Sequence, residues 1–308
     1  MTAHTCSADV EASGPAGAAT PPVAEKKART VTAQLPPLPD PSGLARMSAS
    51  EVRSRFLLQD LFEPGRIRIT HTDLDRASVG GAVPASGPLA LLPPAEFASD
   101  CFAERRELGL FNIGGPGAVS VDGVPYALAH RDALYIGRGS RDIVFASEGA
   151  NWPALFYFVS YPAHARYETR RVRGDEAAAT TVGSAAGANR RTIRKYIQPG
   201  LVDTCQLTMG LTDLEDGSVW NTMPAHRHPR RSEIYFYFGL PADGVVVHLF
   251  GESRETRHIV VRDRQAVLSP EWSMHAGVGT GRYSFIWAMG GENRDFDDMD
   301  GIPMEELA

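Results

Sequence analysis

The sequence has little cysteine, no long apolar run and no excess of basic residues. Its three cysteines, Cys6, Cys101 and Cys205, form no C-x-x-C pair, which argues against a disulfide framework and for reduced thiols in a cytosol. No segment near the N-terminus has the apolar core of a signal peptide, and none reaches the length that crosses a bilayer. We therefore expect a soluble protein in the cytoplasm that has no membrane partner.

The charge balance argues against nucleic acid as a partner. Lysine and arginine together number 31 against 37 aspartates and glutamates, a formal net charge of −6, whereas a surface that binds a duplex normally needs a basic excess. The chain of 308 residues is long enough for two modest domains or one large β domain with a sizeable core.

The N-terminal segment differs in composition from the rest of the chain. Residues 1–43 are rich in Ala, Pro, Ser and Thr without a sustained apolar period, which predicts a disordered extension. Apolar residues recur at helical spacing over residues 45–61, with Ser48 or Ser50 as a possible N-cap. The remaining sequence consists of short Val, Ile, Tyr and Phe runs separated by turns such as Asp122-Gly123. This pattern predicts an all-β fold, either a sandwich or a barrel.

Four potential metal ligands stand at the spacings of a single site: His226, His228, Glu233 and His275. Alternate residues of a β-strand share a face, so the first two imidazoles can point at one ion, and a turn over residues 229–232 can bring the carboxylate alongside. Glu233 opens a run of large apolar residues, where a carboxylate needs a compensating cation. The spacing H-x-H-x4-E, followed by a distant P-x4-H, resembles the metal signature of the cupin barrels. We therefore expect a metal site here.

Two stretches of the chain resemble each other. Residues 132–139 align without a gap with residues 265–272, and the segment before Glu107 is similar to the segment before Glu233. The first copy lacks histidines at the positions that correspond to the ligands. A duplicated barrel with one metal site follows from this comparison.

The resulting prediction is a double cupin, two jelly-roll-like β-barrels with a short N-terminal helix and a disordered tail. The first barrel covers residues 44–185 and has no metal site, and the second covers residues 186–308 and binds the metal. A polar Ala/Thr/Gly segment near residues 175–188 joins them.

The ligand types leave the chemistry open. Four protein ligands around a tetrahedral zinc normally make a closed structural site, whereas five- or six-coordination leaves places for water or substrate. A redox-silent Lewis acid that binds a sugar hydroxyl and carbonyl acidifies the intervening C–H and stabilises an enediolate, which is isomerase chemistry. Iron in the same ligands could activate oxygen instead, so a dioxygenase stays open.

Several side chains near the expected site are candidates for the reaction. Strand alternation places Tyr235 and Tyr237 on the face of Glu233, so both are candidates for proton handling, with packing in the barrel as the alternative role. The candidates for substrate binding are Lys195 and Arg230, because a cation suits a carboxylate, and Trp272, because an indole can wall a sugar pocket.

Two further side chains are less suited to substrate binding. Trp287 could also wall the pocket, although a core role is favoured. A solvated turn suits Arg231 better than a binding role.

At this point the sequence resembles a known family, the 4-deoxy-L-threo-5-hexosulose-uronate ketol-isomerases, from about residue 48 to the C-terminus. The segments that carry the resemblance surround the expected ligands and recur in the first half of the chain. They are residues 221–231, the Tyr/Phe run after Glu233, and residues 269–275, 290–293, 295–300, 104–109 and 130–137.

The resemblance implies a bacterial zinc cupin with one Zn²⁺ per chain, typically a homohexamer. Such an enzyme converts 5-keto-4-deoxyuronate into 3-deoxy-D-glycero-2,5-hexodiulosonate in the breakdown of pectin and related uronates. Its zinc ligands would be His226, His228, Glu233 and His275. The alternatives are 5-deoxy-glucuronate isomerase of inositol catabolism, an iron cupin dioxygenase and a non-catalytic sugar-binding cupin.

Overall fold

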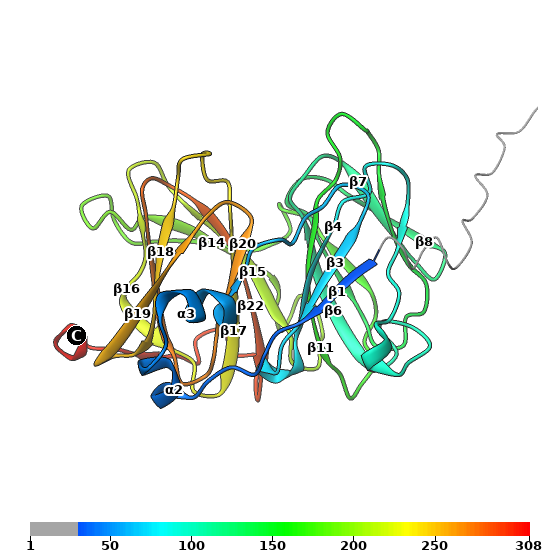
Figure 1. Cartoon of the computed structure of the whole chain (residues 1–308). Coiled ribbons are helices and arrows are strands. Elements are labelled where there is room, and N and C mark those ends of the chain that lie inside the picture. The colour runs from blue at the N-terminus through cyan, green and yellow to red at the C-terminus, as the bar shows by residue number, and fades with distance from the viewer. Residues whose placement is uncertain (1–29) are drawn as a thin grey trace, which may run out of the picture.

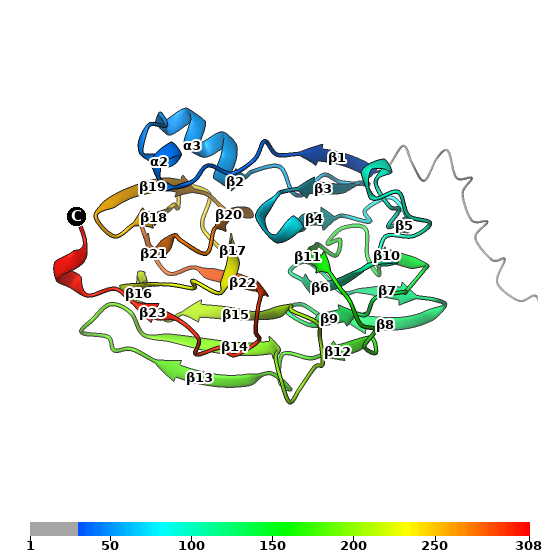
Figure 2. The ribbon, with the colours of Figure 1, turned by 90° about the horizontal axis from the view of Figure 1, so that it is seen from below.

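The protein consists of two β-barrels that lie side by side, as Figures 1 and 2 show. The computed structural model describes residues 30–308. Within this range two α-helices occur, α2 (Pro41–Ala45) and α3 (Ala49–Phe56), together with three single turns of 3-10 helix, at Leu74–Arg76, Ala95–Phe97 and Met304–Glu306. The other elements are strands, so the predicted all-β class is confirmed.

The first barrel is built from a seven-stranded and a four-stranded sheet. The larger sheet has the order β1 (Thr30–Gln34), β3 (Ile67–His71), β4 (Ser78–Ala82), β11 (Phe156–Pro162), β6 (Arg106–Asn112), β9 (Ala133–Ile136) and β12 (Arg170–Val172). The smaller sheet has the order β5 (Leu89–Ala90), β10 (Ile143–Ser147), β7 (Gly117–Val121) and β8 (Val124–Leu128). Nearly all neighbouring strands pair antiparallel, as in a jelly roll.

The second barrel repeats this plan with a seven-stranded and a five-stranded sheet. The larger sheet has the order β13 (Ala178–Val182), β14 (Arg191–Ile197), β15 (Thr208–Leu214), β22 (Ser284–Gly291), β17 (Arg231–Phe238), β20 (Gln265–Ser269) and β2 (Leu57–Leu58). The smaller sheet has the order β19 (Glu255–Val261), β18 (Val246–Glu252), β21 (Met274–Gly279), β16 (Trp220–Arg227) and β23 (Asp300–Gly301).

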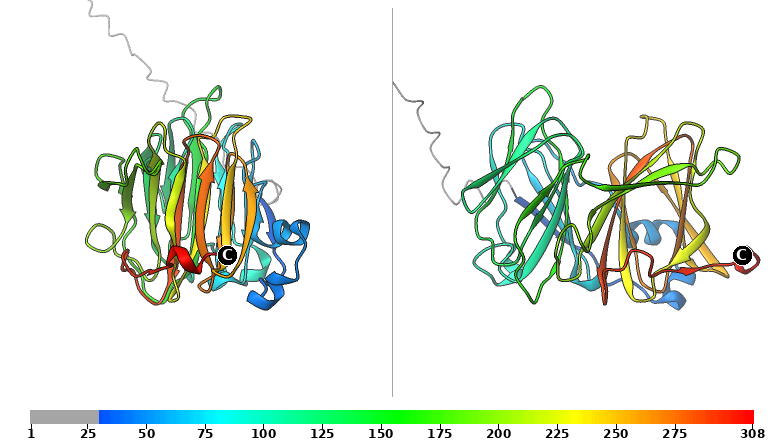
Figure 3. Two further views of the ribbon diagram at one scale, coloured as in Figure 1. Left: turned by 90° about the vertical axis from the view of Figure 1, so that its left-hand side faces the viewer. Right: turned by 180° about the vertical axis from the view of Figure 1, so that it is seen from behind.

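The two seven-stranded sheets pack against each other between the barrels, which Figure 3 shows from two further sides. The central strands of these sheets are therefore covered on both faces, and every residue of β17 is buried. Alternate residues of β17 serve the two sides: Phe236 stacks on Tyr157 of the first barrel at a centroid distance of 4.1 Å, whereas Tyr235 and Tyr237 pack inside the second barrel. This alternation puts the face that carries Glu233 into the second barrel's interior.

The predicted helix is shorter than expected and belongs to the other barrel. Helix α3 begins after Ser48, whose side chain forms a capping box with Glu51, so this N-cap was predicted correctly. The chain leaves the helix at Leu57 and continues as strand β2, which pairs with β20, rather than running to residue 61. Phe56 packs on Phe250 of the second barrel at 5.0 Å between ring centroids.

The prediction of a disordered extension over residues 1–43 is wrong for its last part. Residues 30–34 form β1, which pairs in parallel with β3 of the first barrel, and Asp40 caps helix α2. A sheet edge offers backbone hydrogen bonds to any extended segment, so this strand needs no apolar period of its own. Residues 1–29 lie outside the described part of the chain.

The strand pairings also move the expected domain boundaries. Residues 41–58 associate with the second barrel although they precede the first one in sequence, and β13, at residues 178–182, already belongs to the second barrel's sheet. We therefore propose two units, with the crossing between residues 172 and 178 and with the N-terminal helices assigned to the second unit.

Glu107 does not occupy the position in the first barrel that Glu233 occupies in the second. Its neighbour Leu108 points into the first barrel's core, so Glu107 faces the second barrel. There its carboxylate accepts hydrogen bonds from the backbone N–H groups of residues 205–207, at 2.8 to 2.9 Å, and from the Tyr135 hydroxyl at 2.9 Å. The alignment was out of register by an odd number of residues, which turns a strand side chain to the opposite face.

Candidate metal centre

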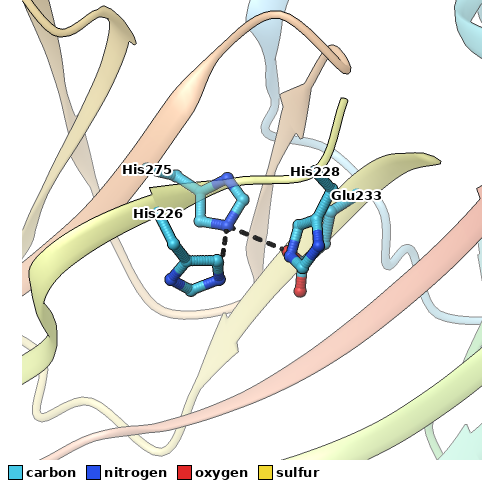
Figure 4. A group of neighbouring side chains, drawn as sticks. All are labelled: His226, His228, Glu233 and His275. Atoms are coloured by element: carbon cyan, nitrogen blue, oxygen red, sulfur yellow. Dashed lines mark hydrogen bonds and ion pairs between the residues drawn. The ribbon is translucent and has the colours of Figure 1, made fainter. Parts of the chain in front are cut away.

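Three strands of the second barrel bring the four predicted ligands together. His226 lies near the end of β16 and His228 follows that strand, while Glu233 lies on β17 and His275 on β21. The Arg231 N–H donates to the His228 carbonyl at 3.0 Å, which closes the expected turn between the first two strands. His226 and His275 are also direct cross-strand partners. Figure 4 shows the three imidazoles and the carboxylate converging on one point.

The distances among the ligand atoms suit a single ion. One atom of each side chain lies within 4.8 Å of the corresponding atom of every other. Nε2 of His275 is 3.1 Å from Nε2 of His226 and 3.1 Å from Oε2 of Glu233, and Nε2 of His228 is also 3.1 Å from that oxygen. Metal–ligand bonds of about 2.0–2.2 Å hold neighbouring ligand atoms roughly this far apart.

The contact between His228 and Glu233 shows why a cation suits this place. Nδ1 of His228 lies 3.1 Å from the backbone carbonyl of Asp298 and 3.2 Å from Nη2 of Arg231. Oε2 of Glu233 lies 3.1 Å from Nε2 of both His228 and His275, and it is buried without a hydrogen-bond partner among residues 30–308. A buried carboxylate needs a compensating positive charge, which a metal ion held between this oxygen and the imidazoles would supply.

The other two imidazoles are oriented in the same way. Nδ1 of His226 lies 2.9 Å from the Thr222 hydroxyl, and Nδ1 of His275 lies 2.9 Å from the Ser269 hydroxyl. Each ring is therefore held from outside by its Nδ1 atom, which leaves Nε2 to point inward. Partners of this kind fix ring orientation and tautomer at metal sites.

The charge states also suit metal binding. Burial lowers the pKa of His226 well below its usual value, and neighbouring imidazoles lower it further. Burial likewise lowers the pKa of His275. Burial by itself raises the pKa of Glu233, but the effects of His275 and His228 outweigh it and hold this pKa well below its usual value. Neutral imidazole and ionised carboxylate are the forms that bind a metal.

Arg231 lies beside the site and not in a solvated turn, so that expectation was wrong. Its side chain is buried, and Nη2 donates to the Asp298 carbonyl at 2.6 Å, the oxygen that also orients His228. Arg230, one residue earlier, pairs with the carboxylates of Asp298 and Asp300. The two arginines together fix the segment that holds His228 in place.

A cavity of about 420 Å³ opens onto the ligands. Its wall is mostly apolar, apart from the metal ligands and a few polar groups. The residues that line it besides His226, His228 and Glu233 are Arg191, Ile193, Thr212, Asn221, Thr222, Met223, Pro224, Ala225, Tyr235, Phe285, Trp287, Met289, Phe296, Met299 and Gly301. A cavity of this size is large enough for a small sugar acid.

The two predicted catalytic tyrosines lie in different surroundings. Tyr235 lines the cavity, and its ring centroid lies 4.9 Å from that of His275. Tyr237 does not line it, and its hydroxyl lies 2.7 Å from Nδ1 of the buried His248. His248 is therefore part of the second barrel's interior beside the site.

The predicted substrate-binding residues lie outside the cavity wall. Arg230 is held by its two aspartates, and Trp272 packs at the edge of the second barrel's core. Lys195 places its Nζ atom 3.9 Å from the centroid of the Phe296 ring, so it contacts a wall residue without lining the cavity itself. Trp287, by contrast, is part of the wall, as considered from the sequence.

Sequence reasoning missed Arg191, the cationic side chain of the wall. It lies four residues before Lys195 on β14, with Ile193 between them on the same face. The strand period therefore indicates that Arg191 and Lys195 share a face, but it does not show which end of the strand reaches the cavity.

Comparison with known proteins gives a consistent result. The model of the KduI/IolB family matches residues 58–302. The chain is 50% identical over 274 residues to the 4-deoxy-L-threo-5-hexosulose-uronate ketol-isomerase of Opitutus terrae, covering 87% of this chain and 97% of that protein. It is 48% identical over 267 residues to the protein of that name from Caldicellulosiruptor bescii, with the same coverage.

Solved structures share the fold at much lower identity. An IolB-like protein from Salmonella typhimurium aligns with a TM-score of 0.61 at 14% identity, over 73% of this chain and 87% of that one. The oxalate decarboxylase of Lactobacillus farciminis aligns with a TM-score of 0.53 at 9% identity, over 73% and 79% of the two chains. These likenesses concern the double-barrel architecture alone. In residues 30–308 no helix has the length and apolar character needed to cross a membrane.

Proposed function

Because the chain belongs to the KduI/IolB family, we propose that it is a 4-deoxy-L-threo-5-hexosulose-uronate ketol-isomerase. It interconverts this 5-keto-4-deoxyuronate and 3-deoxy-D-glycero-2,5-hexodiulosonate in the breakdown of pectin and related uronates. The observation that carries this conclusion is the identity of 48% to 50% with relatives of that name along 97% of their length. The metal centre and its cavity give the chain the groups that this reaction needs.

We propose that His226, His228, Glu233 and His275 hold one zinc ion per chain. Imidazole and carboxylate ligands suit zinc, and an isomerisation transfers no electrons to an external acceptor, so a redox-silent ion is sufficient. When bound, the ion acts as a Lewis acid that polarises the substrate carbonyl and acidifies the neighbouring C–H. The protein contributes the fixed orientation of the four ligands and a largely apolar wall around the substrate.

Proton transfer requires a group that faces both the substrate and the ligands. The reaction moves a hydrogen from the hydroxyl-bearing C2 to the aldehyde carbon C1. Because Glu233 is assigned as a metal ligand, another side chain has to handle protons. We assign proton handling at the substrate oxygens to the Tyr235 hydroxyl, because Tyr235 lines the cavity next to His275. Tyr237, whose hydroxyl is bound to His248, supports the position of Tyr235 from the same face of β17.

The remaining assignments follow from where the side chains lie. Arg230 acts indirectly, by fixing Asp298, whose carbonyl orients His228. Lys195 and Trp272 support the wall, Lys195 through its contact with Phe296. We further propose that the protein is a homohexamer, on the basis of the family resemblance. We also propose that it is cytoplasmic, because Cys101 and Cys205 are free thiols.

Conversion of the purified uronate tests this function. We expect the protein to convert 4-deoxy-L-threo-5-hexosulose uronate to the hexodiulosonate without oxygen, which NMR can follow. Its kcat/KM for this uronate should be at least about 100-fold above that for 5-deoxy-glucuronate, because the ratio of kcat/KM between two substrates depends on how well their groups fit the site. A preference for 5-deoxy-glucuronate would transfer the assignment to that isomerase. Binding of the uronate without turnover would indicate a sugar-binding protein instead.

A further inference from the structure

Arg191 introduces a positive charge into an otherwise apolar part of the cavity wall. It is the first residue of β14 and the only arginine or lysine among the lining residues of the described chain. The wall of the same cavity includes the aromatic rings of Phe285, Trp287 and Phe296. A cation in such surroundings is unfavourable without a partner of opposite charge.

No carboxylate of residues 30–308 forms an ion pair with Arg191. Its Nη1 atom donates to the backbone carbonyl of Asn189 at 2.8 Å, while Nε is buried without an acceptor. Burial accordingly lowers the pKa of this guanidinium. The cavity's own carboxylate, Glu233, is held among the imidazoles.

Neighbouring arginines show that the chain pairs this residue type elsewhere. Arg190 contacts Glu215 at 3.0 Å, and Arg194 contacts Asp213 at 2.6 Å. Both side chains lie outside the cavity wall. Unlike these two arginines, Arg191 has no carboxylate partner in residues 30–308, and it lines a cavity in which a ligand can supply one.

We propose that Arg191 binds the carboxylate of the substrate, and so selects uronates over neutral sugars. This proposal rests on the proposed function. The guanidinium and the metal ligands line the same cavity, so one six-carbon chain can place its carbonyl and hydroxyl at the ligands and its carboxylate at Arg191. The planar guanidinium suits a carboxylate better than an ammonium group does.

The test compares two substrates, the uronate and its primary amide, which lacks the negative charge. For Arg191→Met we expect KM for the uronate to rise about 100-fold, because truncating one partner of a buried charge pair has an effect of this order, with a much smaller change in kcat. KM for the amide should change less than threefold. Arg191→Lys should recover part of the loss, and guanidinium ion added to Arg191→Met should lower KM again.

Arg190→Met is the matched control, because it removes the same charge one residue away on an exposed side chain, and its kinetics should equal those of the unchanged protein. Equal losses on uronate and amide, or an unchanged KM for the uronate in both Arg191→Met and Arg191→Lys, would overturn the proposal. If thermal unfolding shows that Arg191→Met is not folded, the KM values of Arg191→Lys and Arg191→Gln for the uronate and the amide test the proposal instead. Absence of uronate turnover in the unchanged protein would reject the proposed function itself, a result distinct from loss of discrimination alone.

Discussion

His275→Ala is expected to abolish metal binding and to lower isomerase activity by about a thousandfold or more, since the metal supplies several kcal/mol of transition-state stabilisation. The imidazole is central to the cluster, with Nε2 at 3.1 Å from both His226 and Glu233. Removing it leaves a gap between the remaining ligands. Elemental analysis of the purified variant and an anaerobic assay measure the two effects.

A matched histidine variant shows whether the effect is local. His258 lies exposed on β19 of the same barrel, so His258→Ala should retain both metal and turnover. The thermal midpoint of His275→Ala, compared with that of the metal-free unchanged protein, separates metal loss from unfolding. Full metal occupancy with unchanged turnover in His275→Ala would show that the ligands have been assigned wrongly.

Tyr235→Phe should lower kcat about 100-fold without loss of metal, a typical contribution of a positioned proton-transfer group. The substitution removes only the hydroxyl at the cavity wall and keeps the ring contact with His275. Steady-state kinetics together with metal analysis measure this separation of catalysis from binding.

Tyr237→Phe removes the same atom from the next tyrosine of the same strand face. Its hydroxyl bonds to His248, away from the cavity, so we expect near-normal kcat and a loss of about 1 kcal/mol in unfolding free energy. Equal effects of the two substitutions on kcat would contradict the separate roles assigned here.

The four residues that converge at the candidate metal centre could be identified from the sequence because each one carries its own chemical signal. Three histidines and a glutamate are rare at strand spacing, and alternation puts His226 and His228 within reach of one ion. The duplicated all-β plan was also visible, in the two similar segments at residues 132–139 and 265–272. These features depend on local periodicity and residue type.

The errors concern residues whose partners lie far away in the sequence. The sequence makes Arg230 a candidate for carboxylate binding, but its partner in the structure is Asp298, 68 residues later. Residues 30–34 form a strand because they pair with the edge strand β3. Helix α3 packs on the second barrel, whose strands other than β2 begin more than a hundred residues later. Glu107 shows that a register error by an odd number of residues in a strand reverses the side chain's face.

The central claim is a metal-dependent isomerisation that needs no oxygen, and turnover in deuterium oxide under strict anaerobiosis tests it most directly. Protein stripped of metal and protein reloaded with zinc would be assayed side by side, and the product examined by mass analysis. We predict activity that rises with occupancy to one ion per chain, without added cofactor, and deuterium at the former aldehyde carbon, C1 of the substrate. Turnover that requires oxygen, or full activity in the stripped protein, would contradict the account.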